Sequence, residues 1–214
     1  MTEYTSRRRF LKAAAATGTL AGVNATVLAQ DGGAGDQLVV LDGLTSGWLA
    51  YRLPGGAEAT GTTRNPTLTF QEGTTYTLVW VNGDGEPHNF AIQDDGGENL
   101  QVLRPLGIEQ EVYQQLNETG ANESVSLDVS EGNVTGVSAG NESGGMTGNQ
   151  TAGDGGGELV AETEIISEEG AVQAVQFTAS AEMASYICLV HPNTMVGDVE
   201  VGSGGGGAGN GSSM

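Results

Sequence analysis

Four side chains that can bind a metal stand in a suggestive order along the chain. The 214 residues include one cysteine and two histidines. Cys188 and His191 lie in Cys-Leu-Val-His-Pro-Asn-Thr-Met, which ends at Met195, and His88 lies far upstream in Pro-His-Asn-Phe. A thiolate and a thioether favour Cu(I), and imidazoles also accept Cu(II), so these donors together suit a copper ion that changes charge. Such a site could carry single electrons.

Two other interpretations account for less of this pattern. A cysteine and two histidines also bind zinc, but a structural zinc site normally has a further thiolate, imidazole or oxygen donor in place of methionine. A free cysteine is often a small buried apolar residue, and an isolated histidine is often part of a core. Neither interpretation explains why all the histidine and cysteine of the chain occur in this order before a methionine.

Short runs rich in β-branched and aromatic residues, separated by turns, must position these side chains. Such runs occupy residues 38–41, 67–70, 76–81, 90–92, 158–166, 174–178, 185–188 and 196–201. They predict an all-β chain folded as an antiparallel sandwich or barrel. Only residues 108–116 predict a helix, of about two turns. A sandwich brings one ligand on a strand close to three ligands on the loop between two other strands.

The composition changes between residues 117 and 157. This stretch has eleven glycines and six acidic residues, and it has no basic or aromatic residue. It contains too little apolar surface to offset its ordering entropy, so we expect a flexible insertion that the copper site does not need. Five N-glycosylation sequons begin at Asn117, Asn122, Asn133, Asn141 and Asn149.

The charge of the chain excludes some partners. Acidic residues outnumber basic ones 27 to 7, for a net charge of −20. Four of the seven basic residues (Arg7, Arg8, Arg9 and Lys12) lie in the first twelve positions. The rest of the chain would repel nucleic acid and anionic lipid surfaces.

The N-terminus has the layout of an export signal. Ser-Arg-Arg-Arg-Phe-Leu-Lys at residues 6–12 matches the twin-arginine motif, and an Ala-rich run follows to Ala29. We therefore expect a twin-arginine signal peptide at residues 1–29, a domain at residues 30–201, and a disordered Gly/Ser tail at residues 202–214. No later segment is apolar for 18 residues, so we expect no membrane span and an extracellular or cell-surface protein.

With these residues in place, the chain resembles the cupredoxins of the plastocyanin and halocyanin kind, and its acidity resembles the haloarchaeal members. The resemblance covers about residues 60–115 and 158–201 and implies a Greek-key β-sandwich with one type 1 copper ion. It implies equatorial ligands His88, Cys188 and His191 and a long axial ligand Met195. It also implies that Asn89 hydrogen-bonds the two ligand-bearing segments together. The Cys-x2-His-x3-Met spacing is one residue shorter than in plastocyanins and one longer than in amicyanins.

The resemblance implies an exported electron carrier, not an enzyme, with redox protein partners such as membrane respiratory components. We expect a monomer in which the edge of His191 is more exposed than His88 and lies in a small apolar patch. One alternative is a protein that sequesters or delivers copper outside the cell. Another is a glycosylated surface protein in which the same domain is only structural.

Overall fold

The computed structural model describes residues 37–56, 61–119, 125–139 and 158–203, all within one compact unit, Asp31–Met214. The expected signal peptide and nearly all of the expected tail lie outside the described residues. The elements in chain order are β1 (Leu38–Leu44), β2 (Gly47–Arg52), a short 3₁₀ helix η2 (Pro54–Gly56), β3 (Leu68–Gln71), β4 (Thr75–Asn82), β5 (Ala91–Gln93), β6 (Arg104–Ile108), α1 (Gln110–Glu118), β7 (Val125–Ser130), β8 (Asn133–Ala139), β9 (Val172–Thr178), β10 (Ser185–Ile187) and β11 (Val196–Gly202).

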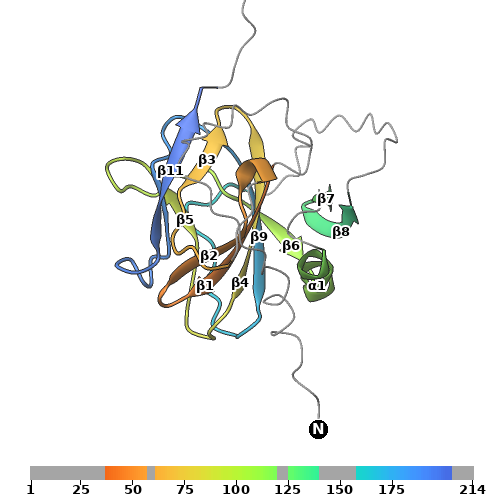
Figure 1. The fold of residues 1–214 in the computed structure, drawn as a ribbon. Helices are drawn as coiled ribbons and strands as arrows, with labels where there is room; N and C mark the ends of the chain where they lie inside the picture. The colour runs from red at the N-terminus through yellow and green to blue at the C-terminus, as the bar shows by residue number, and fades with distance from the viewer. Residues whose placement is uncertain (1–36, 57–60, 120–124, 140–157, 204–214) are drawn as a thin grey trace, which may run out of the picture. The chain divides into compact units, whose positions relative to one another are not determined.

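The strands form two sheets, which confirms the all-β sandwich (Figure 1). One sheet has the order β2-β1-β4-β9-β6-β8-β7 and the other the order β3-β11-β10-β5. Successive strands from β3 to β6 alternate between the two sheets. The expected antiparallel pairing holds for most neighbouring strands, but β1 with β4, β3 with β11 and β6 with β8 are parallel pairs. These partners are distant in sequence, so crossover connections can bring them together in parallel.

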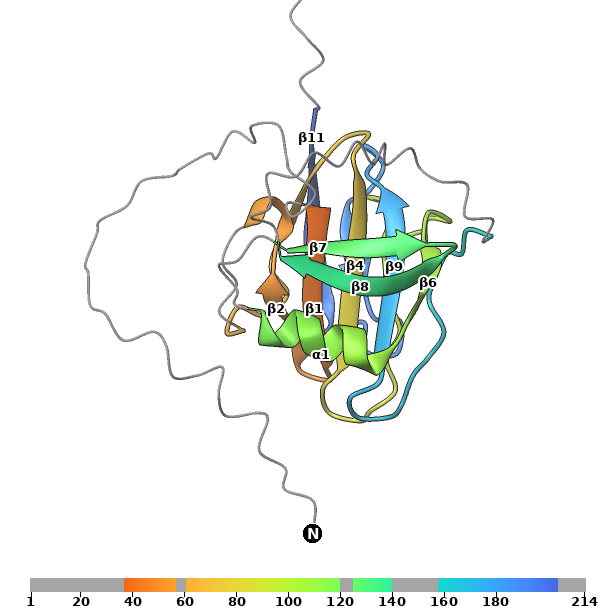
Figure 2. The same ribbon diagram turned by 90° about the vertical axis from the view of Figure 1, so that its right-hand side faces the viewer.

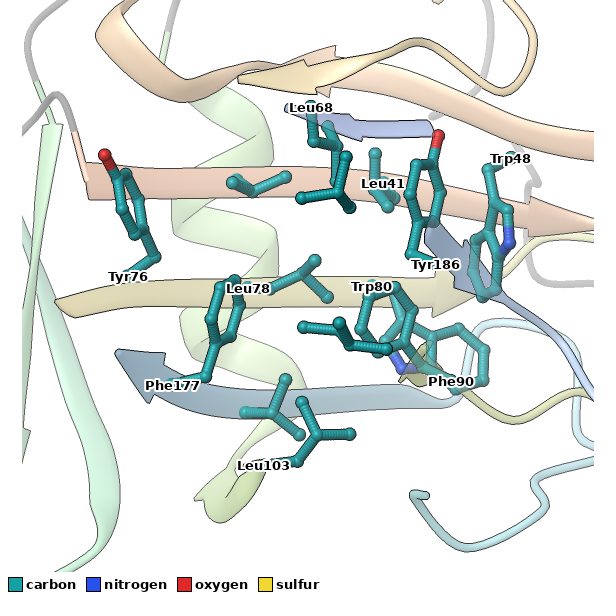
Figure 3. Close-up of a cluster of buried hydrophobic side chains, with 14 of the residues drawn as sticks. Leu41, Trp48, Leu68, Tyr76, Leu78, Trp80, Phe90, Leu103, Phe177 and Tyr186 are labelled. Carbon is teal, nitrogen blue, oxygen red and sulfur yellow. The ribbon is translucent and has the colours of Figure 1, made fainter. Parts of the chain in front are cut away.

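The main core lies between the two sheets and is rich in aromatic rings (Figure 3). Trp48 makes edge-to-face contacts with Trp80 at 5.5 Å and with Phe90 at 5.6 Å between ring centroids. Such pairs each add about 0.5–1.5 kcal/mol beyond the burial of their area. Cys188 and Met195 belong to the same core cluster. The sandwich therefore encloses part of the candidate site in packed apolar surroundings.

A second cluster covers the outer face of the seven-stranded sheet. Figure 2 shows α1 and the β7–β8 hairpin lying across β1, β4 and β9. Leu116 of α1 and Leu127 of β7 are buried in this cluster with Val40 and Val79 of the sheet. The helix predicted at residues 108–116 is therefore confirmed, shifted by two residues at each end. Within the described part of the chain, no helix is long and apolar enough to cross a membrane.

The prediction that the whole of residues 117–157 is flexible is wrong for residues 125–139, which form the β7–β8 hairpin. The hairpin contributes three buried apolar side chains, Val125, Leu127 and Val134. The composition of the whole 41-residue stretch did not reveal these apolar residues, because glycine and acidic residues dominate that composition. The described residues do not include 120–124 and 140–157. The sequons at Asn122, Asn141 and Asn149 therefore lie outside them. Asn133 is exposed at the start of β8.

The strand predicted at residues 158–166 is also corrected. This segment makes only isolated bridges, from Val160 to Leu103, from Glu162 to Ala91 and from Ile166 to His88. Thr163 breaks the ladder, because its hydroxyl accepts the hydrogen bond from the Phe90 N–H that a backbone carbonyl would accept in a regular strand (3.0 Å). The segment still fixes the backbone of His88.

Candidate metal centre

The structure brings His88, Cys188 and His191 together at one point. The Nδ1 atoms of the two histidines are 3.1 Å apart. The Cys188 Sγ lies 3.8 Å from Nδ1 of His88 and 3.9 Å from Nδ1 of His191. Two nitrogens and one sulfur therefore form a nearly isosceles triangle.

This triangle has the size that a metal ion needs. A point within it lies about 2.0 Å from each nitrogen and about 2.2 Å from the sulfur, close to the ~2.0–2.1 Å and ~2.3 Å of zinc–nitrogen and zinc–sulfur bonds. Two imidazoles and one thiolate in a trigonal arrangement are the donor set of a blue-copper site. The residues present therefore fit a copper ion of this kind.

His88 is held by the backbone on either side of it. Its N–H donates to the carbonyl of Ile166 at 3.0 Å, and its own carbonyl accepts from the N–H of Ile166 at 2.9 Å. His88 lies just before β5 and its side chain is fully buried. The backbone that carries the imidazole is therefore fixed, and the imidazole has no access to bulk water.

The other candidate ligands share one short loop between β10 and β11. The Cys188 N–H donates to the carbonyl of Met195 at 2.9 Å, and the Met195 N–H donates to the carbonyl of His191 at 2.9 Å. A further bond runs from the His191 N–H to the carbonyl of Cys188 at 3.1 Å. The loop is closed on itself by these bonds, so its side chains are positioned before any ion binds.

Met195 lies in this loop and is fully buried. Its carbonyl accepts a hydrogen bond from Nε1 of Trp48 at 3.2 Å. Its Cε packs beside Gly43, where an added Cβ would lie 3.5 Å from that methyl group. These contacts fix Met195 in the loop that carries Cys188 and His191, and its role as an axial ligand stays a prediction.

Asn89 ties the two ligand segments together, as the family resemblance implies. Its backbone N–H donates to Sγ of Cys188 at 3.5 Å. Its side-chain oxygen accepts from the backbone N–H of Leu189 at 2.8 Å. The expected hydrogen bonds are confirmed, and they limit movement of the sulfur relative to His88.

The surroundings of Cys188 favour the thiolate. Burial raises the pKa of the thiol, but hydrogen bonds from His88, from the Asn89 N–H and from His191 outweigh burial and lower the pKa to about 6. Burial lowers the pKa of His88. Its hydrogen bonds to Cys188 and Asp84 and the charge of Asp84 raise that pKa by more than burial lowers it, so the pKa of His88 lies above its ordinary value. A thiol that loses its proton near neutral pH is ready to bind a metal.

Asp84 is a partner of the site that the sequence analysis missed. Its Oδ1 lies 2.8 Å from Nε2 of His88. A carboxylate here accepts the proton of Nε2. Once Nδ1 has given up the proton that it shares with Cys188, its lone pair faces Cys188 and His191. Burial raises the pKa of Asp84, but hydrogen bonds from Thr45, His88 and Glu86 lower it to about 2. The only sequence signal was an aspartate four residues before a histidine, inside a turn.

The two histidines differ in exposure. His88 is fully buried, whereas His191 is half-buried and follows Val190, which is 38% exposed. Leu189 is half-buried and Pro192 is exposed on either side. The expectation that His191 is the more exposed histidine is confirmed, and the apolar patch around its edge stays a prediction.

Comparisons with known proteins give distant likenesses only. No family model matches the chain, and no curated protein matches it. Among solved structures, auracyanin A, a "blue" copper protein from Chloroflexus aurantiacus, is 18% identical, with 77% of this chain and 98% of that chain covered and a TM-score of 0.33. Amicyanin from Paracoccus versutus is 16% identical over 77% of this chain and 81% of that chain, with a TM-score of 0.31. Reduced rusticyanin is 15% identical over 77% and 78%, with a TM-score of 0.34. Likeness at this level assigns no activity to the chain.

Proposed function

We propose that this protein carries single electrons through one type 1 copper ion held by His88, Cys188 and His191, with Met195 as the axial ligand. The observation that supports this most strongly is the triangle of two Nδ1 atoms and one Sγ, with edges of 3.1, 3.8 and 3.9 Å. Copper, when bound, supplies the one-electron Cu(II)/Cu(I) couple.

The protein's own residues hold the ligands in place and exclude water from them. Asn89 fixes the sulfur of Cys188 to the His88 segment, and the loop from Cys188 to Met195 is closed by its own backbone bonds. His88, Cys188 and Met195 are shielded from water. A frame that does not move when charge changes lowers the reorganisation that each electron transfer needs. Three strong protein donors and a thioether leave no open position for a substrate, which favours a carrier over an enzyme.

One experiment separates a carrier from a protein that stores or delivers copper. The copper-loaded protein is cycled by voltammetry, and X-ray absorption is measured in both oxidation states. A carrier gives a reversible one-electron wave and the same ligand set in both states. Loss of copper, or replacement of ligands on reduction, would contradict the proposal and favour storage or delivery.

We propose that electrons enter and leave at His191, through the patch formed by Leu189, Val190 and Pro192. Replacing Val190 with Asp places a charge that must lose water whenever the patch docks. We expect electron self-exchange between copies, measured by NMR in high salt, to slow about tenfold, or ~1.4 kcal/mol. The visible spectrum should not change. Val129, which is 39% exposed on the β7–β8 hairpin, offers the control Val129→Asp. Equal slowing by both variants would place the exit elsewhere.

We propose further that the protein is exported by the twin-arginine route, works as a monomer in high salt and docks with basic redox proteins, such as components of a respiratory chain. The arginine pair and the acidic composition support this. Changing Arg7 and Arg8 together to lysine keeps the charge and removes the guanidinium groups. We expect most of that variant to stay inside the cell in a fractionation assay. Export at the normal level would point to a different route.

A further inference from the structure

Thr45, in the turn between β1 and β2, is hydrogen-bonded toward both ligand segments. Its backbone N–H and its hydroxyl donate to Oδ2 of Asp84 at 2.6 and 2.8 Å. The other oxygen of Asp84 contacts Nε2 of His88 at 2.8 Å. On the opposite side, the hydroxyl of Thr194 donates to the carbonyl of Thr45 at 2.5 Å. A single residue therefore links the His88 segment to the loop from Cys188 to Met195.

The same hairpin holds that loop at two further points. Asn65 accepts a hydrogen bond from the backbone N–H of Trp48 in β2 and donates to the carbonyl of Thr194, both at 2.8 Å. Nε1 of Trp48 donates to the carbonyl of Met195 at 3.2 Å. Neither ligand segment belongs to β1 or β2, so these contacts cross-link the hairpin to the site.

We propose that the β1–β2 turn is a clamp for the metal centre, in which Asp84 is a positioning residue that orients His88 and tunes the potential, and Thr45 holds Asp84 in place. This inference rests on the proposed function, because it concerns the same copper site. Asp84 supplies a negative charge and an acceptor to the ligand that is fully buried. Its side chain is 27% exposed, so water screens it only in part.

The expected direction follows from charge. A carboxylate that accepts the Nε2 proton makes the imidazole a stronger donor, and its charge stabilises Cu(II) more than Cu(I). Removing such a partner of a metal-binding histidine typically costs about 10–100-fold in affinity. If the loss falls on Cu(II), each tenfold change raises the potential of a one-electron couple by about 59 mV.

The first test is Asp84→Asn, which keeps the shape of the side chain and removes its charge. We expect a potential at least about 59 mV higher, for a tenfold loss of Cu(II) affinity. The matched control is Glu86→Gln, because Glu86 is exposed and lies two residues from both Asp84 and His88. It removes the same charge without touching the His88 contact, so we expect a much smaller shift. Equal shifts in the two variants would overturn the clamp and leave only a general effect of surface charge.

The second test addresses Thr45. Thr45→Val removes one donor to Asp84 and keeps both backbone contacts. The carboxylate is then held less firmly against His88, so we expect a potential that is higher than in the native protein, in the same direction as in Asp84→Asn but by less. Thr45→Ser keeps the hydroxyl and should restore the native potential. An unchanged potential in the valine variant would contradict the role given to Thr45.

A third measurement needs no copper. In ¹⁵N NMR spectra of the metal-free protein, we expect the proton of neutral His88 on Nε2, and its redistribution to both nitrogens in Asp84→Ala. A neutral His88 whose single proton sits on Nδ1 in the native protein would overturn the clamp even if the copper chemistry were as proposed. Absence of a reversible copper couple in the native protein would overturn the proposed function while this NMR result still stood.

Discussion

Replacing Cys188 with serine is expected to abolish the blue colour of the copper-loaded protein. The thiolate is the soft, anionic ligand of the triangle, and serine puts a hard, neutral hydroxyl in the same place. The substitution removes only the sulfur, so the buried loop should keep its backbone bonds. Visible absorption and copper titration of the two proteins, at equal copper content, measure the loss.

Met195→Leu is the matched control for this substitution. Leucine has nearly the volume of methionine, so the core should tolerate it at a cost below about 1.5 kcal/mol. An axial thioether is a weak, long ligand, and its loss should leave the colour in place while it changes the potential. A serine variant at position 188 that stays blue, or a leucine variant at position 195 that loses its colour, would contradict the assignment of the ligands.

Leu127→Ala is expected to lower the free energy of unfolding by about 2–5 kcal/mol, the cost of removing a large side chain from a packed core. Leu127 is buried in β7 against the outer face of the seven-stranded sheet. The loss is a large part of the 5–15 kcal/mol that stabilises a typical domain. Denaturant unfolding of the metal-free protein measures it, and the copper spectrum of the folded variant should be unchanged.

The control for this substitution is Val129→Ala in the same strand. Val129 is 39% exposed, so its truncation should change the free energy of unfolding by no more than about 0.5 kcal/mol. If Leu127→Ala were as mild as Val129→Ala, the hairpin would not be part of the folded core. The original expectation of a wholly flexible insertion would then hold.

The strands that the sequence predicts well are those with a clear pattern. Residues 78–81 of β4 are a continuous apolar run in the middle of the larger sheet, and all four are buried because both faces of that sheet are covered. β2 was missed because Trp48 and Ala50 face the core while Leu49 and Tyr51 are also partly buried, so no alternation is visible. β6 was missed because it contains Pro105 and Gly107, which strands disfavour. Long-range pairing with β9 and β8 stabilises it nonetheless.

The candidate ligands were predictable for a different reason. Histidine and cysteine are so rare in this chain that their order carries information even without a fold. Asp84 was not predictable in the same way, because it is one of 27 acidic residues and nothing in its spacing to Thr45 indicates a contact. Its role depends on a turn that the tertiary structure brings to His88. The histidines and the cysteine can therefore be identified as candidate ligands from the sequence, whereas the role of Asp84 can be inferred only from the folded structure.

The visible spectrum of the copper-loaded protein tests the central claim most directly. We predict an intense blue absorption from the contact between the Cys188 thiolate and Cu(II), which disappears on one-electron reduction and returns fully on oxidation. The same experiment on Cys188→Ser sets the background. A native protein that binds copper without this absorption, or whose spectrum equals that of the serine variant, would contradict the assignment of a type 1 copper site.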